Sequence, residues 1–175
     1  MNKNRALALL TIVFSFTLHA HNLKIGYTNA EYILSRLPEA RVIESQLKEY
    51  EGQLQRQLQY KYEAFQAKAA DFKNNAASMN EAARADKERE LQSLQENIQT
   101  FKVEAEAALL KKRNQLLAPA VEKVGEAIRD VAEAHGFQFV FSSGAAGLDV
   151  LLFAEERSNI TDLVMAKLGI DPPEE

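Results

Sequence analysis

The chain has 175 residues, of which 46% are hydrophobic and 26% charged, with no Cys and no Trp. This length and composition suit one modest domain. The formal net charge of −4 argues against a globally basic nucleic-acid-binding protein, because such proteins gather Lys and Arg to meet phosphates.

The first twenty residues have the order of a secretory signal peptide. Lys3 and Arg5 precede the apolar run ALALLTIVFSFTL, and the stretch ends at Ala20, a small residue suited to cleavage. An uncleaved membrane anchor or a buried helix is the competing interpretation, although the run is short for a bilayer. Cleavage after residue 20 would leave 155 residues with 19 basic and 25 acidic side chains, a net charge of −6. We therefore expect an exported, soluble, acidic protein.

A strand and then a long helical hairpin are predicted next. Residues 23–27 alternate apolar with polar or small side chains, which is typical of a strand with one buried face. Apolar residues then recur every three or four positions, as in a coiled-coil seam, on either side of a polar stretch at residues 73–80. The seam positions include Leu47, Leu54, Leu58, Phe65, Leu91, Leu94, Ile98 and Phe101. We expect residues 47–114 to form an antiparallel arm about 45 Å long.

The remaining segments predict a small body, formed by residues 21–46 and 115–175. Apolar spacing continues past Pro119, which predicts a helix with a kink near residues 115–119, and Gly136 ends that helix. FQFVF, residues 137–141, and VLLF, residues 150–153, predict two further strands, the first with Phe137, Phe139 and Phe141 on one face. A last helix follows the cap residues between Ser158 and Thr161. The fold class is α+β, mainly α.

Residues that could carry chemistry are scarce. SSGAAG, residues 142–147, is followed by Leu148 and Asp149 instead of the Lys of a phosphate-binding loop, so a connection is the favoured interpretation. The carboxylates alternate with Lys and Arg on helix surfaces, and the three His residues form no metal-binding set. We predict no catalytic residue, no metal, no cofactor and no enzymatic activity.

Charge is distributed unevenly along the chain. The range 47–114 has 12 basic and 11 acidic residues, whereas 115–175 has 4 and 11. The single basic cluster is KKR, residues 111–113, which is either an anion or lipid-headgroup contact or a solvated helix face.

A three-stranded sheet of residues 23–27, 137–141 and 150–153 would leave open edges and an apolar face. Pairing with further copies of the chain would cover both, so we predict a small cyclic homo-oligomer. The predicted oligomerisation residues are Ile25, Tyr27, Phe137, Phe139, Phe141, Val150 and Leu152.

The order of these segments resembles the Skp/OmpH family of periplasmic chaperones over essentially all of the mature chain. The resemblance is carried by KIGYTN, the long hairpin, LLAPAVEKVGEAIRDVAEAHGFQFVF, VLLF and NITDLVMAKLG, in which Asn159, Ile160 and Thr161 stand at a "DIT"-like helix start. It implies a homotrimer whose strands form a β-barrel body and whose three arms enclose a cavity. There the family holds unfolded outer-membrane proteins without ATP, with contacts spread diffusely over the inner arm faces.

Two points stay open beside this resemblance. Family members often have strongly basic arms and a proposed lipopolysaccharide-binding role, but these arms sum to only +1, so no lipid site is assigned and weak salt dependence is expected. The alternative function is an exported structural coiled coil or adaptor that docks one folded partner. A chaperone should instead bind several unrelated unfolded proteins.

Overall fold

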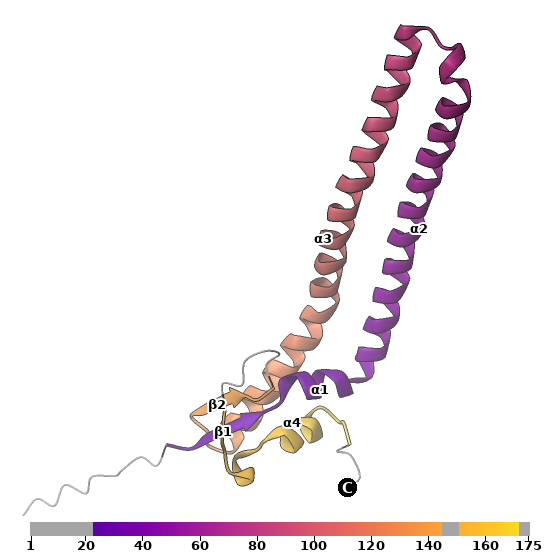
Figure 1. The fold of residues 1–175 in the computed structure, drawn as a ribbon. Coiled ribbons are helices and arrows are strands. Elements are labelled where there is room, and N and C mark those ends of the chain that lie inside the picture. The colour runs from indigo at the N-terminus through magenta and orange to yellow at the C-terminus, as the bar shows by residue number, and fades with distance from the viewer. Residues whose placement is uncertain (1–22, 145–150, 172–175) are drawn as a thin grey trace, which may run out of the picture.

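The computed structural model describes residues 23–144 and 151–171, which form a long helical hairpin rising from a small body (Figure 1). The hairpin consists of α2 (Pro38–Asn75), the short 3-10 helix η1 (Ala76–Ser78) and α3 (Glu81–Ala134). The body contains β1 (Ile25–Thr28), α1 (Ala30–Arg36), β2 (Phe139–Ser142), the 3-10 helix η2 (Glu156–Ser158) and α4 (Thr161–Lys167). The mainly helical α+β class is confirmed, and so is the hairpin.

Local sequence signals set the ends of the two arm helices. Pro38 is the first residue of α2, where a missing backbone N–H breaks no helical hydrogen bond. The extended conformation of Leu37 before it separates α1 from α2. At the tip of the hairpin, the Asn80 side chain accepts a hydrogen bond of 2.8 Å from the backbone N–H of Ala83 and so caps α3.

The arm helices share a narrow apolar seam. Ile98 is 3% exposed, and the other predicted seam residues are half-buried: Leu47, Leu54, Leu58, Phe65, Leu91, Leu94 and Phe101. Lysines cover aromatic rings across the seam, with Lys61 Nζ 5.1 Å from the ring centre of Phe101 and Lys102 Nζ 5.3 Å from that of Tyr62. The seam therefore combines apolar contacts with cation–π contacts, and most of the arm surface meets solvent.

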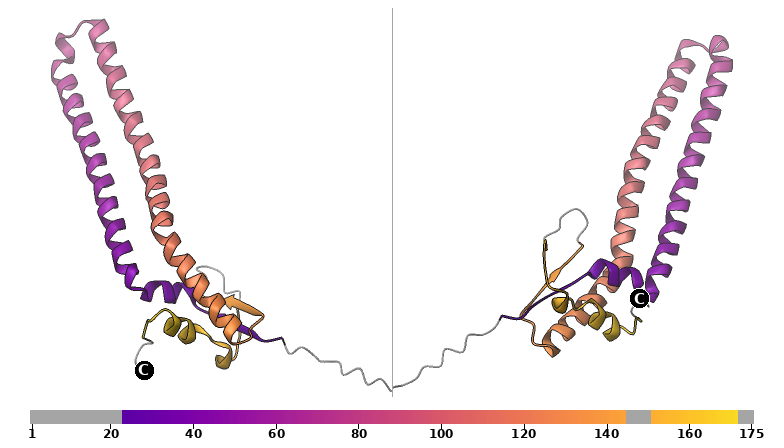
Figure 2. Two further views of the ribbon diagram at one scale, coloured as in Figure 1. Left: turned by 180° about the vertical axis from the view of Figure 1, so that it is seen from behind. Right: turned by 60° about the horizontal axis from the view of Figure 1, so that its bottom comes forward.

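Pro119 lies where α3 changes its packing partners. The upper part of α3 pairs with α2, whereas the lower part packs on α1 and α4. The helix continues through Pro119, and Figure 2 shows that it changes direction toward the body. The ring of Pro119 removes one backbone donor and displaces the preceding turn, which is a usual cause of a bend in a helix.

The core of the body lies between α1, the lower part of α3 and α4. It consists of apolar residues from all three helices, namely Ile33, Leu37, Ala120, Val124, Ala127, Val131, Ile160, Val164 and Met165. Each large side chain buried in this way contributes about 1.5–3 kcal/mol. The core holds the base of the arm against the sheet.

Phe137 corrects one sequence prediction, because it belongs to the core side of the body and not to the exposed row with Phe139 and Phe141. Gly136, with φ of +70°, ends α3. The backbone N–H of Gly136 donates to Glu133 O and that of Phe137 to Ala132 O, at 3.2 and 2.9 Å. This hydrogen-bond pattern turns the residue after the glycine back onto its own helix. Phe137 accordingly packs against the core.

The sheet has two parallel strands among the described residues, with Ile25 beside Phe139 and Tyr27 beside Phe141. The predicted third strand is not present over residues 151–153, and Val150 lies outside the described residues. Its place beside β1 is taken by an isolated parallel bridge between Tyr27 and Asn159. Because a strand needs a neighbouring edge to satisfy its backbone groups, residues 151–153 of a single chain remain irregular.

Candidate oligomerisation and client-binding surfaces

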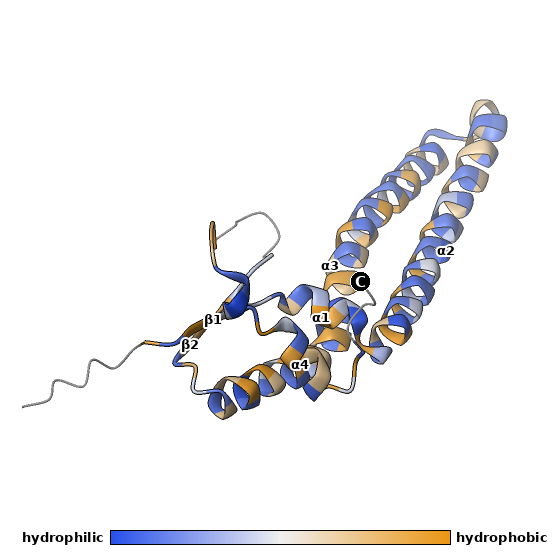
Figure 3. Cartoon of the chain, turned by 90° about the horizontal axis from the view of Figure 1, so that it is seen from below, coloured by the Kyte–Doolittle hydropathy of each residue, from blue (hydrophilic) through white to orange (hydrophobic). Residues whose placement is uncertain are grey.

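One face of the sheet is apolar and open to solvent. The register places Ile25, Tyr27, Phe139 and Phe141 on the same face, and Ile25, Phe139 and Phe141 are 42%, 54% and 44% exposed. The opposite face is buried at Gly26 and Thr28. Figure 3 shows hydrophobic residues along these strands. The structure thus brings together four of the seven predicted oligomerisation residues.

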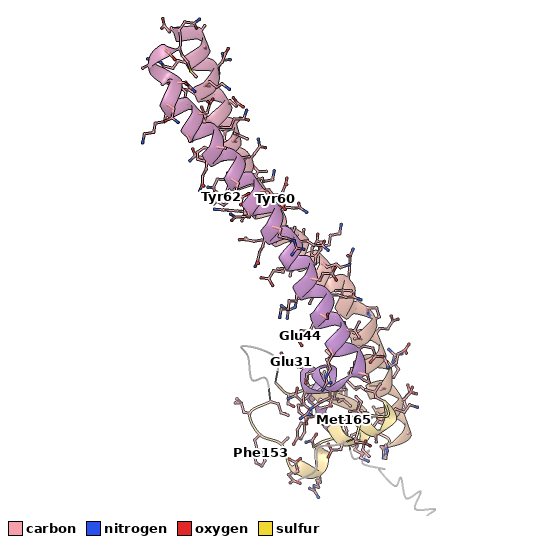
Figure 4. The ribbon with its side chains drawn as sticks, turned by 90° about the vertical axis from the view of Figure 1, so that its right-hand side faces the viewer. Glu31, Glu44, Tyr60, Tyr62, Phe153 and Met165 are labelled. Carbon is pink, nitrogen blue, oxygen red and sulfur yellow. The ribbon has the colours of Figure 1, made fainter. Side chains whose placement is uncertain are left out.

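Residues 151–158 border this face and add further exposed apolar groups. Leu152 and Phe153 are 90% and 85% exposed, and Figure 4 places Phe153 at the edge of the body. A hollow of about 310 Å³ lies between Ile25, Tyr27 and the segment that includes Phe153. A contiguous group of exposed apolar side chains of this kind makes the surface a candidate interaction site. Phe153 was not among the predicted residues, although the run VLLF contains it.

The segment Asn159–Thr161 fixes the position of α4 against β1. The backbone N–H of Ile160 donates to Tyr27 O at 2.9 Å, and Ile160 is 1% exposed. The Thr161 hydroxyl lies 3.3 Å from that of Thr28 and accepts a hydrogen bond from the Asn29 backbone N–H. The "DIT"-like motif therefore has a structural role. Its backbone and its Thr161 hydroxyl provide hydrogen-bond partners for polar groups of β1 and of the residue that follows β1.

Tyr27 makes a polar contact at the rim of the exposed face that changes its pKa. Its hydroxyl donates to Glu156 Oε2 at 3.1 Å. Desolvation, followed by the hydrogen bond and charge of Glu156, raises the pKa of Tyr27 above its usual value of 10.0. Tyr27 therefore stays neutral at physiological pH, which suits a side chain on an apolar surface.

The basic residues of the arm are largely engaged with other arm residues. Lys112, from the KKR cluster, lies with Nζ 5.9 Å from the Tyr50 ring centre. Lys68 of α2 and Lys87 of α3 both contact Glu90 of α3, and their hydrogen bonds lower the pKa of Glu90 to about 2. Lys111 and Arg113 are exposed. The contact with Tyr50 favours, for Lys112, the interpretation of KKR as part of a helix surface over that of an anion or lipid-headgroup site.

The structure tests the other chemical candidates only in part. Gly144 has φ of +86° and lies two residues after the end of β2, while residues 145–150 of the glycine-containing loop lie outside the described residues. His135 is the C-terminal cap residue of α3. Over residues 23–144 and 151–171, no cluster of three or more potential metal ligands occurs. None of the helices in the same ranges combines the length and apolar character needed to cross a membrane.

Comparison with known proteins gives one family and one fold. Residues 24–168 match the family model described as "Outer membrane protein (OmpH-like)". Among solved structures, the chain is similar to an OmpH-like protein from Caulobacter crescentus CB15, assigned as an outer membrane chaperone. The TM-score is 0.67 at 14% sequence identity, over 83% of each chain. None of the curated proteins matches the chain in sequence.

Proposed function

Because the chain belongs to the OmpH-like family, we propose that it is a periplasmic chaperone that binds unfolded outer-membrane proteins and prevents their aggregation without ATP. The observation that carries this proposal is the family match over residues 24–168, which spans both the arm and the body. The fold shared with the OmpH-like protein from Caulobacter crescentus supports it. In this proposal a cleavable signal peptide, residues 1–20, directs export.

The physical character of the arm supports a holding function. Its helices present scattered apolar groups, such as Val42, Tyr60, Val103 and Leu110, each more than half exposed between charged residues. Each contact of this kind is weak, but many of them together hold a disordered chain. Because each contact exchanges easily, the chain is released when it folds elsewhere. Release then needs no nucleotide.

The proposal includes a homotrimer in which the exposed sheet face is covered by other copies. Ile25, Tyr27, Phe139 and Phe141 would lie in this interface, with Leu152 and Val150 from the following segment. Adjacent copies would offer residues 151–153 the strand edge that they lack in one chain, and a closed barrel would leave no open edge. The mass of the mature protein, measured by light scattering after size-exclusion chromatography, should be three times that of one chain. A monomer at micromolar concentration would contradict the interface.

The chaperone function is tested by diluting a denatured outer-membrane protein from urea with and without the mature chain. Light scattering should fall in the presence of a threefold molar excess of protomer. Folded forms of the same client should not bind. No suppression would contradict the proposal, and tight binding to one folded partner would instead support the adaptor alternative.

Client binding should depend only weakly on salt because the arms are nearly neutral, with 12 basic and 11 acidic residues over 47–114. Binding measured from 25 to 300 mM salt, roughly a threefold change in Debye length, should change by less than about tenfold. A collapse of binding at moderate salt would point to lipid-like or phosphate-like electrostatic recognition instead.

A further inference from the structure

Two adjoining, mainly apolar hollows lie between α2 and α3 along the lower half of the arm, and together they are called the groove. Its lower part, about 760 Å³, has a floor that includes Ile43, Leu47 and Leu117. Its upper part, about 310 Å³, has a floor that includes Leu54, Leu58 and Phe101. Glu51 lines both parts, so the two hollows adjoin.

The length of the groove fits a short extended peptide. From Ala40 at one end to Leu58 at the other, α2 advances 18 residues, or about 27 Å. An extended chain covers this distance with about eight residues, of which about four face the floor. A strand that crosses an outer membrane has about 9–11 residues and alternates apolar with polar side chains. An apolar floor with an open, solvated side therefore matches one such strand before it folds.

The rim gives the lower end a charge preference. Glu31 of α1 and Glu44 of α2 lie one above the other at the base of the arm (Figure 4), and Glu51 follows. Lys48 and Arg113 line the same part of the groove, so carboxylates exceed cations there by three to two. Within residues 23–144 and 151–171, neither Glu31 nor Glu44 takes part in an ion pair. The lower end therefore favours a ligand with Lys or Arg beside its apolar residues.

The groove walls are helices, whose backbone groups are already hydrogen-bonded within the helix. A bound peptide cannot add a strand here, as it can at a sheet edge, and contacts only side chains. Binding of one segment is accordingly weak and exchangeable, which suits a client that must leave in an unfolded form.

We propose that this groove is a client-contact surface of the arm and takes one extended segment of alternating apolar residues with a basic residue at the Glu31 and Glu44 end. This inference rests on the proposed chaperone function and names its ligand class and its site. The other possible occupant is a segment of a second copy of this chain, which crosslinking between chains would reveal.

The test uses the full mature chain and two fluorescent ten-residue peptides of alternating leucine and serine, one flanked by two lysines and one by two glutamates. The Kd of each is measured by anisotropy at low salt for wild type and two double variants. The first variant, Glu31→Gln with Glu44→Gln, alters the rim. The matched control, Glu49→Gln with Glu63→Gln, removes the same charge on the opposite side of α2 from the groove.

Wild type and the control should prefer the lysine peptide by about fivefold, as two solvent-exposed charge pairs allow, and the rim variant should lose this preference. A photo-crosslinker on the lysine peptide should label residues between Ala40 and Leu58 of α2 or between Phe101 and Ala120 of α3. The proposal would be overturned if both variants lost the preference for the lysine peptide equally, or if the crosslinker labelled only the sheet face. Crosslinks between chains from a label placed in the groove would assign it to a second copy. Suppression of client aggregation by the same wild-type sample separates failure of the groove from failure of the chaperone function.

Discussion

Lys68 of α2 and Glu90 of α3 form an ion pair that joins the two helices in the outer half of the arm, with Nζ and Oε1 2.5 Å apart. Lys87 of α3 contacts the other carboxylate oxygen at 2.9 Å. The hydrogen bond from Lys68, followed by that from Lys87, lowers the pKa of Glu90 from 4.5 to about 2. The pKa of Lys87 is raised for the same reason.

Replacing Glu90 by Gln should therefore lower arm stability most above about pH 4.5 and progressively less as pH falls below that value. A carboxylate with a lowered folded-state pKa stabilises the fold where it is ionised in both states, and this contribution disappears as pH falls from 4.5 toward 2. The Tm difference between wild type and Glu90→Gln, followed by circular dichroism, should be largest near pH 6 and shrink toward zero at pH 2. Glu104→Gln, at an exposed position of α3, is the control and should show a small difference at every pH. A constant difference for Glu90→Gln would contradict the ion-pair explanation.

Phe137 and Phe139 should respond differently to substitution, although they are two residues apart. Phe137→Ala removes a ring that packs on the core and should lower the free energy of unfolding by about 2 kcal/mol, with the oligomer mass unchanged below the Tm. Phe139→Asp places a charge on a side chain that is 54% exposed in one chain, so its helix content should be retained. That variant should lose the oligomer and client protection together, because the proposed interface would have to bury the charge. A Phe139→Asp protein that stays oligomeric and fully active would contradict the assigned interface.

Two glycines should respond oppositely to alanine. Gly144 has φ of +86°, and an added Cβ would lie 2.9 Å from the side chain of Asn29, the residue that caps α1. Gly144→Ala should therefore lower the free energy of unfolding by about 1–3 kcal/mol. Gly125 lies inside α3 with open space around its Cβ position, and Gly125→Ala should raise that free energy by about 0.5–1 kcal/mol. Urea titrations of both variants measure the two changes, and the same sign for both would contradict the structural explanation.

Local patterns predicted the arm well because each one acts within a few residues. The three-and-four spacing places Leu54 and Phe101 on the seam, Asn80 supplies its cap, and Gly136 ends α3, all without help from distant parts of the chain. The face of Phe137 was predicted incorrectly because strand alternation was extended back to a residue that the helix terminator controls. Gly136 was the signal, since the residue after such a glycine commonly contacts its own helix.

The exposed sheet face and the groove were harder to predict than the helices and strands. Ile25, Phe139 and Phe141 follow from strand periodicity, but the absence of a strand at residues 151–153 depends on which edges one chain can offer. The groove was missed because Leu47 and Leu54 were fully explained by the seam. Only the spacing between α2 and α3 leaves them half-buried and open on one side.

Ile98 should control the stability of the arm independently of the body, because it is the one seam residue of the described hairpin that is nearly fully buried, at 3% exposed. Ile98→Ala should cost about 2 kcal/mol locally, since the slender arm has few other buried side chains to compensate. Hydrogen exchange followed by mass spectrometry should show faster exchange across α2 and the upper part of α3, while peptides that contain Val124 and Val131 keep their protection. Val103→Ala, at a 68% exposed position of the same helix, should leave exchange unchanged. If Ile98→Ala accelerated exchange equally in the arm and the core, the two parts would unfold as one cooperative unit, contrary to this prediction.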